Sequence, residues 1–175
     1  MDPSLERDFT RFVEDRTHAL FRVAYALTGN QHAAEDLLQT ALSRAAARWS
    51  HVRGDGEAYV KRSLYHQHIS VWRYRRRRPE TPVPVPPDRG HSGDMAEETV
   101  QRVRLRAALA TLPPRQRAVV VLRYLDDLSE REVADILGCS TGTVGSQAAR
   151  ALARLRIEVS GHDPLGPANL QEVIR

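Results

Sequence analysis

The chain has 175 residues, of which 41% are hydrophobic and 27% are charged, values that fit a folded protein of one domain or two small ones. Its 26 basic and 22 acidic side chains give a net charge of +4, and because Lys61 is the only lysine, nearly all of the positive charge lies on arginine, which pairs well with phosphate and guanine. Cys139 is the only cysteine, so an internal disulfide is excluded. The N-terminus lacks a secretory signal, and the longest apolar run, 118–122, is too short to span a bilayer. These features predict a cytoplasmic protein with no membrane segment.

The first fifty residues carry two amphipathic helical patterns. Apolar residues recur at helical spacing over 9–27, and Gly29-Asn30 ends that pattern. The spacing repeats over 34–49. We therefore expect two antiparallel helices joined by a short turn, followed by a glycine-containing loop over 50–57.

A third helix is predicted over 58–74, either continuous or interrupted near 65–68. The segment 72–78 reads Trp-Arg-Tyr-Arg-Arg-Arg-Arg. Aromatic rings stack on unpaired bases while guanidinium groups follow phosphates, so this segment suits nucleic acid. The alternative is a solvated helix end whose arginines offset the negative end of the helix dipole. Five arginines in six residues exceed what a helix end needs, which favours the first interpretation.

The middle of the chain has the composition of a linker. Five prolines fall within 79–87, and glycines and polar residues follow, so a linker is predicted over 79–98, stiff first and flexible later. Helical patterns resume over 95–111 and 115–124. The proline- and glycine-containing segment after residue 160 is predicted to be a loose tail.

Two short helical patterns joined by a tight turn follow, over 129–156. Ser129 and Glu132 fit a capping box, and Gly138 ends the first helix. Ser140 or Thr141 can cap the second helix. That helix has an apolar face at Val144, Ala148, Ala151, Leu152 and Leu155, and a polar face at Thr143, Gln147, Arg150 and Arg154.

This pattern is typical of a helix-turn-helix, whose second helix lies in the major groove of DNA. The first helix, with Val119, Val120 and Leu122, is expected to form the small core that holds the second helix outward. Gln and Arg side chains can pair with base edges, and backbone N–H groups at a helix start favour phosphate. The alternative is a three-helix bundle with a solvated basic face.

Taken together, the two halves resemble a small extracytoplasmic-function (ECF) sigma factor of bacterial RNA polymerase, over 9–78 and 99–156. Asp-Leu-Leu-Gln-Thr-Ala at 36–41 resembles the region 2 segment that docks on the polymerase clamp. The segment from Ala-Tyr-Val at 58–60 to Trp-Arg at 72–73 resembles the part that opens and reads the promoter −10 element. Leu-Pro-Pro-Arg-Gln-Arg at 112–117, with Gly-Cys-Ser-Thr-Gly-Thr-Val at 138–144, resembles region 4, which reads the −35 element.

The resemblance implies an all-α fold of two small helical domains: region 2 at 1–78, a Pro-rich linker at 79–98, and region 4 with its helix-turn-helix at 99–160, before a tail at 161–175. It implies a sigma factor that binds core RNA polymerase at the clamp and flap, and directs promoter-specific initiation on −35 duplex and unpaired −10 DNA. It implies no cofactor and no bound metal. It allows a further partner, an anti-sigma factor.

The resemblance also implies site residues. For the −10 element they are Lys61, Arg62, Tyr65, His66, Gln67, His68, Trp72, Arg73, Arg75 and Arg76. For the −35 element they are Ser140, Thr141, Thr143, Gly145, Ser146, Gln147 and Arg150. For polymerase they are Asp36, Leu37, Gln39 and Thr40. Three positions depart from the family: His66 stands where asparagine is frequent, Gly145 where a basic residue is common, and Gln147 where arginine is common. The base sequences that the chain recognises in the −10 and −35 elements therefore stay open.

Two other classes of function compete with this one. A helix-turn-helix regulator, such as a response-regulator output domain or a repressor, would bind duplex DNA without polymerase, but leaves 9–78 unexplained. An enzyme is disfavoured, because no phosphate loop and no nucleophile with a paired base is present. His66 and His68, two apart on a helix, point to different faces and do not form a metal site.

Overall fold

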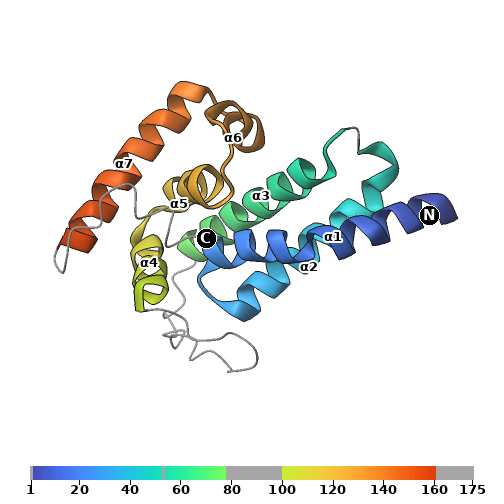
Figure 1. Cartoon of the computed structure of the whole chain (residues 1–175), viewed down its shortest axis with the longest axis horizontal. Coiled ribbons are helices and arrows are strands. Elements are labelled where there is room, and N and C mark those ends of the chain that lie inside the picture. Colours follow the sequence, from blue (N-terminus) through green and yellow to red (C-terminus); the bar gives the residue numbers. More distant parts are fainter. Residues whose placement is uncertain (1, 53, 78–99, 161–175) are drawn as a thin grey trace.

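The structure, a computed structural model, describes residues 2–52, 54–77 and 100–160, and within these ranges it consists of helices and contains no strand (Figure 1). This confirms the predicted all-α fold. The predicted linker at 79–98 and tail at 161–175 lie outside the described residues. The elements are the helices α1 Pro3–Thr28, α2 Gln31–Arg48, α3 Gly56–Arg77, α4 Val100–Thr111, α5 Pro114–Val120, α6 Glu130–Leu137 and α7 Thr141–Ser160, with a 3-10 turn η1 Trp49–His51 and a π-helical turn η2 Val121–Leu125.

The boundary between α1 and α2 lies where the sequence predicts it. Gly29 adopts the left-handed conformation (φ 69°) that ends α1, and its N–H donates to the Tyr25 carbonyl. Asn30 then caps α2, accepting a hydrogen bond at 2.9 Å from the Ala33 N–H. A two-residue connection of this kind makes α1 and α2 a helical hairpin, as expected.

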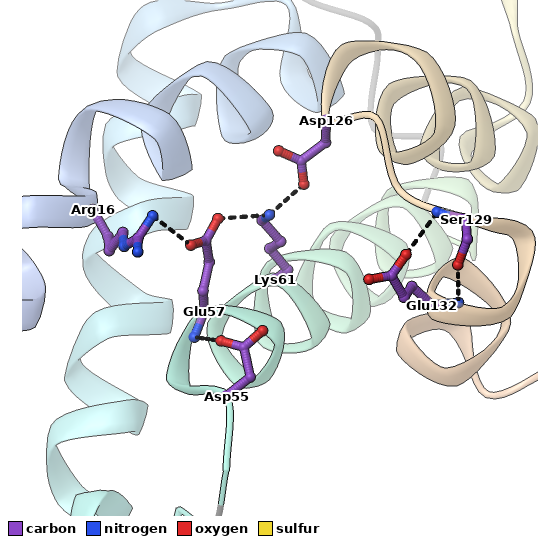
Figure 2. Close-up of polar contacts among 7 residues, drawn as sticks. All are labelled: Arg16, Asp55, Glu57, Lys61, Asp126, Ser129 and Glu132. Atoms are coloured by element: carbon purple, nitrogen blue, oxygen red, sulfur yellow. Dashed lines mark hydrogen bonds and ion pairs between the residues drawn. The ribbon is translucent and has the colours of Figure 1, made fainter.

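The helix α3 is continuous from Gly56 to Arg77, so of the two predicted alternatives the interrupted helix is wrong. It begins two residues before the predicted start at 58, because Asp55 accepts a hydrogen bond at 2.8 Å from the Glu57 N–H (Figure 2). Gly56 is needed there for close packing: a Cβ atom would lie 2.7 Å from the Trp49 ring. Trp49 itself packs on Phe9 and Phe12 and fixes the start of α3 against α1.

The largest apolar core lies among α1, α2 and α3, and it is not confined to the N-terminal half. Leu20, Leu27 and Leu64 are among its fully buried side chains. Ala118 and Val121, from α5 and η2, are buried in the same cluster. The helices α5 and α6 pack directly against α3, which Figure 1 shows running between them and the α1–α2 hairpin. The two predicted halves are therefore in contact through a shared core, which the sequence analysis did not anticipate.

The C-terminal half has two smaller clusters. The predicted core beneath the helix-turn-helix contains Val119 and Leu122, packed with Val133, Ile136 and Val144. The prediction that Val120 belongs to the same core is wrong. A helical residue points about 100° away from its neighbour. Val120 accordingly joins a separate cluster between α4 and the later turns of α7, whose other members are Ala108, Leu109, Leu112, Ala151 and Leu155.

No helix within the described ranges is both long enough and apolar enough to cross a bilayer.

Candidate nucleic-acid interface

The turn that leads into α7 is built by local hydrogen bonds at both ends of α6. Ser129 and Glu132 form the predicted capping box: the Glu132 N–H donates to Ser129 Oγ at 3.2 Å, and the Ser129 N–H donates to Glu132 Oε2 at 2.7 Å (Figure 2). These hydrogen bonds lower the pKa of the Glu132 carboxyl. Gly138, at φ 65°, ends α6 in the left-handed conformation. The predicted helix-turn-helix geometry is confirmed.

Ser140, rather than Thr141, caps α7. The Thr143 N–H donates to Ser140 Oγ at 3.1 Å, and the two hydroxyls of Ser140 and Thr143 lie 2.9 Å apart. Ser146 Oγ donates to the Thr143 carbonyl at 3.0 Å. Three hydroxyl groups assigned to the −35 element, those of Ser140, Thr143 and Ser146, thus also hold the first turn of α7, while Thr141 is exposed. Because the N–H groups of this turn lie at the helix start, phosphate is favoured there.

The apolar and polar faces of α7 lie as predicted. Val144, Ala148, Ala151 and Leu155 are buried. Thr143, Ser146, Arg150 and Arg154 are exposed, and Gln147 and Leu152 are half-buried. The helix therefore presents a polar face with Gln147 at its edge and Arg150 fully accessible.

Gly145 is not required by packing inside the chain. A Cβ atom built there would lie 3.7 Å from Glu130 Oε1, an ordinary contact distance. The Glu130 carboxylate, from the first turn of α6, therefore lies beside the glycine. A carboxylate can accept a hydrogen bond from the N4 amino group of cytosine, which a basic residue cannot do.

The predicted −10 residues divide between the two sides of α3. Arg62, His66, Trp72 and Arg73 are exposed, and Gln67 and His68 are half-buried. The side chains of Arg75 and Arg76 lie outside the described residues, although their backbone is helical. Lys61 and Tyr65 are buried, at 6% exposure each, so in this conformation neither side chain is presented to DNA. This corrects the prediction for both, and the reason is the continuous helix, which turns positions 61 and 65 toward the C-terminal half.

Lys61 lies in a polar network that joins the two halves (Figure 2). Its ammonium group bonds Glu57 Oε1 at 2.7 Å and also bonds the Asp126 carboxylate. Arg16 bonds the other oxygen of Glu57 at 3.2 Å. Burial alone lowers the pKa of Lys61, but hydrogen bonds to Asp126 and Glu57 outweigh it, so this pKa lies above its ordinary value of 10.5.

This network predicts a loss of stability in alkali. Lys61 stabilises the fold fully below pH 10.5, and that contribution is lost as the pH rises through the higher folded-state pKa. Burial raises the pKa of Tyr65 above 10.0, which has the same sign, because the folded chain holds this proton more tightly. We expect the free energy of unfolding, from denaturant titrations at pH 8–11.5, to fall above pH 10. The decline should be shallower in Lys61→Met with Tyr65→Phe; an unchanged slope would contradict the assignment.

A basic pocket of about 550 Å³ lies between α2 and α3. Its lining residues are Arg44, Ala47, Arg48, Tyr59, Arg62, Ser63 and His66. Three of the seven are arginines and none is acidic, so the pocket suits an anionic ligand, and the Tyr59 ring offers an apolar surface for a base. The sequence analysis assigned Arg62 and His66 to DNA but missed Arg44, Arg48 and Tyr59. The signal it could have used is the spacing of four between Arg44 and Arg48, on a helix whose opposite face is apolar.

The predicted polymerase residues lie on α2 with different exposures. Asp36 and Gln39 are exposed, and Thr40 is half-buried, with its hydroxyl donating to the Asp36 carbonyl at 2.8 Å. Leu37 is a core residue at 5% exposure. The prediction that Leu37 belongs to a docking surface is therefore corrected, because its side chain packs inward with α1 and α3.

The structure defines a class of protein in which a helix-turn-helix unit packs on a three-helix unit, and the three-helix unit carries a second basic surface. The sigma-70 region 2 family matches residues 12–78, and the sigma-70 region 4 family matches residues 102–155. The chain therefore belongs to the sigma-70 family, and its curated relatives place it among the ECF RNA polymerase sigma factors. It directs promoter-specific transcription, and a helix-turn-helix regulator that works without polymerase is not favoured.

Three relatives illustrate the similarity. The RNA polymerase sigma-E factor of Streptomyces coelicolor is 39% identical over 158 residues, which are 89% of this chain and 88% of that protein. The ECF RNA polymerase sigma factor SigE of Mycolicibacterium smegmatis is 34% identical over 155 residues, 84% of this chain and 60% of that protein. Among solved structures, the sigma factor RpoE of Bartonella quintana, in complex with the anti-sigma factor NepR, matches with a TM-score of 0.74 at 25% identity, over 90% of this chain and 99% of that chain.

Proposed function

We propose that this sigma factor captures the unpaired −10 strand on the exposed side of α3 and in the pocket between α2 and α3. The observation that carries the proposal is the gathering of Arg44, Arg48 and Arg62 around His66 and Tyr59 without any carboxylate. Guanidinium groups can bind the strand's phosphates, and the rings can stack on a base taken out of the duplex. Arg73, which is exposed, extends the same side of α3 toward its C-terminus. Trp72, at 38% exposure, supplies a further ring next to it in the chain.

The second part of the proposal assigns the −35 duplex to α7. Its start supplies backbone N–H groups with Thr141 and Thr143 for phosphate, and Gln147 lies about one turn and Arg150 about two turns further along. Ser146 and Gly145, with Glu130 beside it, complete the side that faces the bases. Side chains near the start of such a helix meet base edges, whereas later ones meet the backbone.

The third part concerns domains and partners. The proposed boundaries are 1–78 for region 2, 79–98 for the linker, 99–160 for region 4 and 161–175 for the tail. Asp36, Gln39 and Thr40 bind the polymerase clamp, and region 4 binds the flap. The chain acts in the cytoplasm and is not an enzyme. Because a similar solved sigma factor is bound to an anti-sigma factor, such a protein is a further proposed partner.

The experiment that tests the whole proposal is run-off transcription with core polymerase on a library of genomic fragments, with the start sites sequenced. We expect start sites that share one motif near −35 and another near −10. Transcription without shared motifs would contradict the assignment of α7 and α3 to base recognition.

Docking on polymerase gives a direct prediction. Asp36→Arg with Gln39→Arg should weaken core binding at least tenfold, because two positive side chains replace an acidic and a neutral one on the exposed side of α2. Helicity should not change. The matched control is Glu6→Arg with Thr10→Arg, which also replaces an acidic and a neutral side chain by arginine, on an exposed side of α1. Equal affinities for the two variants, measured by titration with labelled core enzyme, would rule out this docking surface.

The proposed recognition of bases by α7 gives a second prediction. Gln147→Ala should change base preference at one position of the −35 element, at a cost of about 1–3 kcal/mol, because an amide can make a bidentate contact with adenine. Arg150→Ala, its control, should lower output with less change in preference. The measurement is transcription of a saturated −35 hexamer library by each holoenzyme. If Gln147→Ala lowers output evenly across all sequences, specificity lies instead with Arg150, the backbone beside Gly145, or DNA shape.

A further inference from the structure

One acidic side chain lies against the helix that is proposed to read the −35 duplex. Glu130 is the first residue of α6, which packs against the start of α7 (Figure 1). A Cβ atom on Gly145 of α7 would be 3.7 Å from Glu130 Oε1 and 4.0 Å from Oε2. Because position 145 is a glycine, no side chain from that position covers the carboxylate.

The Glu130 carboxylate is an exposed acceptor. Its side chain makes no hydrogen bond and no ion pair with the described residues. Glu132, two residues further on, is by contrast engaged in the capping box with Ser129 (Figure 2). That capping box holds the first turn of α6 and with it the backbone of Glu130. The carboxylate is therefore carried by an ordered helix end, at the edge of a surface that is proposed to bind a polyanion.

Gly145 and Gln147 flank the exposed face of α7 from opposite sides. Successive residues of a helix are separated by about 100°. Ser146 and Arg150 are exposed, whereas Gly145 and Gln147 are half-buried. Seen from Ser146, the two half-buried positions lie about 100° to either side. The flanks of a helix that lies in a groove face different bases, so we expect Glu130, beside Gly145, and Gln147 to meet different positions of the −35 element.

The chemistry of a carboxylate limits the base that it can meet. An ionised carboxylate only accepts hydrogen bonds. In the major groove guanine presents the acceptors N7 and O6, and thymine presents the acceptor O4. Adenine presents the N6 donor next to the N7 acceptor, whereas cytosine presents the N4 donor and no acceptor of its own. A negative charge near phosphates also weakens binding to every sequence, unless a donor on the DNA offsets the repulsion.

We propose that Glu130 determines specificity in the −35 element by accepting a hydrogen bond from the N4 amino group of a cytosine. This rests on the proposed use of α7 for the −35 duplex. At the same position the carboxylate repels the acceptors of guanine and thymine, so that it discriminates by repulsion as well as by attraction. Gly145 belongs to the same arrangement, because a basic side chain there would pair with Glu130 and withdraw it from the base. One contact of base recognition therefore comes from α6.

The test is transcription of a saturated −35 hexamer library by holoenzymes that contain Glu130→Gln or the control Asp135→Asn. Both variants remove one negative charge from an exposed position of α6, and position 135 lies about 140° around that helix from Glu130. The parent and Asp135→Asn should prefer a C·G pair in one orientation by about tenfold at one position. Glu130→Gln should lose most of this preference, because an amide can also donate to guanine or thymine.

A uniform rise in output across all sequences with Glu130→Gln would mean that the carboxylate only repels phosphate, and the proposal would be wrong. Two substitutions at Gly145 give an independent measurement. A Cβ atom fits there at an ordinary contact distance, so Gly145→Ala should keep the C·G preference. Gly145→Arg should abolish it by pairing with Glu130, and its melting temperature shows whether the chain stays folded.

The inference and the proposed function fail in different ways. If the parent holoenzyme prefers particular bases in the hexamer, but Glu130→Gln and Gly145→Arg leave every preference unchanged, Glu130 does not read a base and only this inference is wrong. If the parent holoenzyme shows no base preference anywhere in the hexamer, α7 itself does not read the duplex, and the proposed function of α7 is wrong as well.

Discussion

Lys61→Met is expected to lower the free energy of unfolding by about 2–4 kcal/mol. Removing one member of a buried ion pair costs about 3–5 kcal/mol, because its partner stays buried without a counter-charge. The expected loss of stability is smaller than this because Glu57 and Asp126 retain 19% and 16% exposure and can be partly hydrated. Methionine keeps all but the last atom of the side chain's length, so the loss is mainly electrostatic. The measurement is equilibrium denaturation in urea at pH 7.

The control is the double variant Lys61→Met with Asp126→Asn. Neutralising Asp126 removes one of the two carboxylates that Lys61 compensates, while Arg16 still balances the other, Glu57. The double variant should therefore recover part of the lost stability, so that the free-energy losses of the two single variants do not add up in the double-mutant cycle. Strictly additive losses would mean that Lys61 and Asp126 do not interact in solution.

Arg44→Glu with Arg48→Glu is expected to slow open-complex formation on the order of 100-fold. Each arginine that bonds a phosphate contributes about 1.5 kcal/mol, or about tenfold, and both line the pocket beside His66. Permanganate footprinting of unpaired thymines measures opening, and a titration with core enzyme shows separately that the variant still binds polymerase. The salt dependence should also flatten, by about 0.7 in log–log slope for each lost contact with a single strand.

The matched control is Arg7→Glu with Arg11→Glu. These two arginines are also four apart and exposed, but they lie on α1, away from the pocket. The control changes the net charge of the chain by the same amount. Equal losses in both variants would show that opening responds to total charge, and the pocket would then have no specific role.

Local features of the fold could be predicted from the sequence because their causes are local. Gly29, Asn30 and the Ser129–Glu132 pair set helix ends through bonds that span a few residues. The face of α7 followed from periodicity in the same way. The continuity of α3 could not be predicted in this way. Its middle is held by Leu64 and Ile69, whose packing in the core overrides a weak local preference for helix.

Features that join distant segments could not be predicted. Arg44 and Arg62 lie on different helices, and only their packing brings them to one pocket. Lys61 was predicted to contact DNA because the resemblance to the family places it in the −10 segment. Its partner Asp126 lies in the other half of the chain, and no periodicity links the two. The burial of Leu37 was visible in the apolar pattern of its helix, but the resemblance to a docking motif outweighed that pattern.

The apolar contact between the two halves of the chain should depend on temperature in a characteristic way. Moving α5 and η2 away from α3 exposes Ala118 and Val121 to water, and hydration of apolar surface raises the heat capacity. The attraction between such surfaces weakens on cooling. The contact between the two halves should therefore become weaker as the temperature falls, even where the helices themselves stay intact.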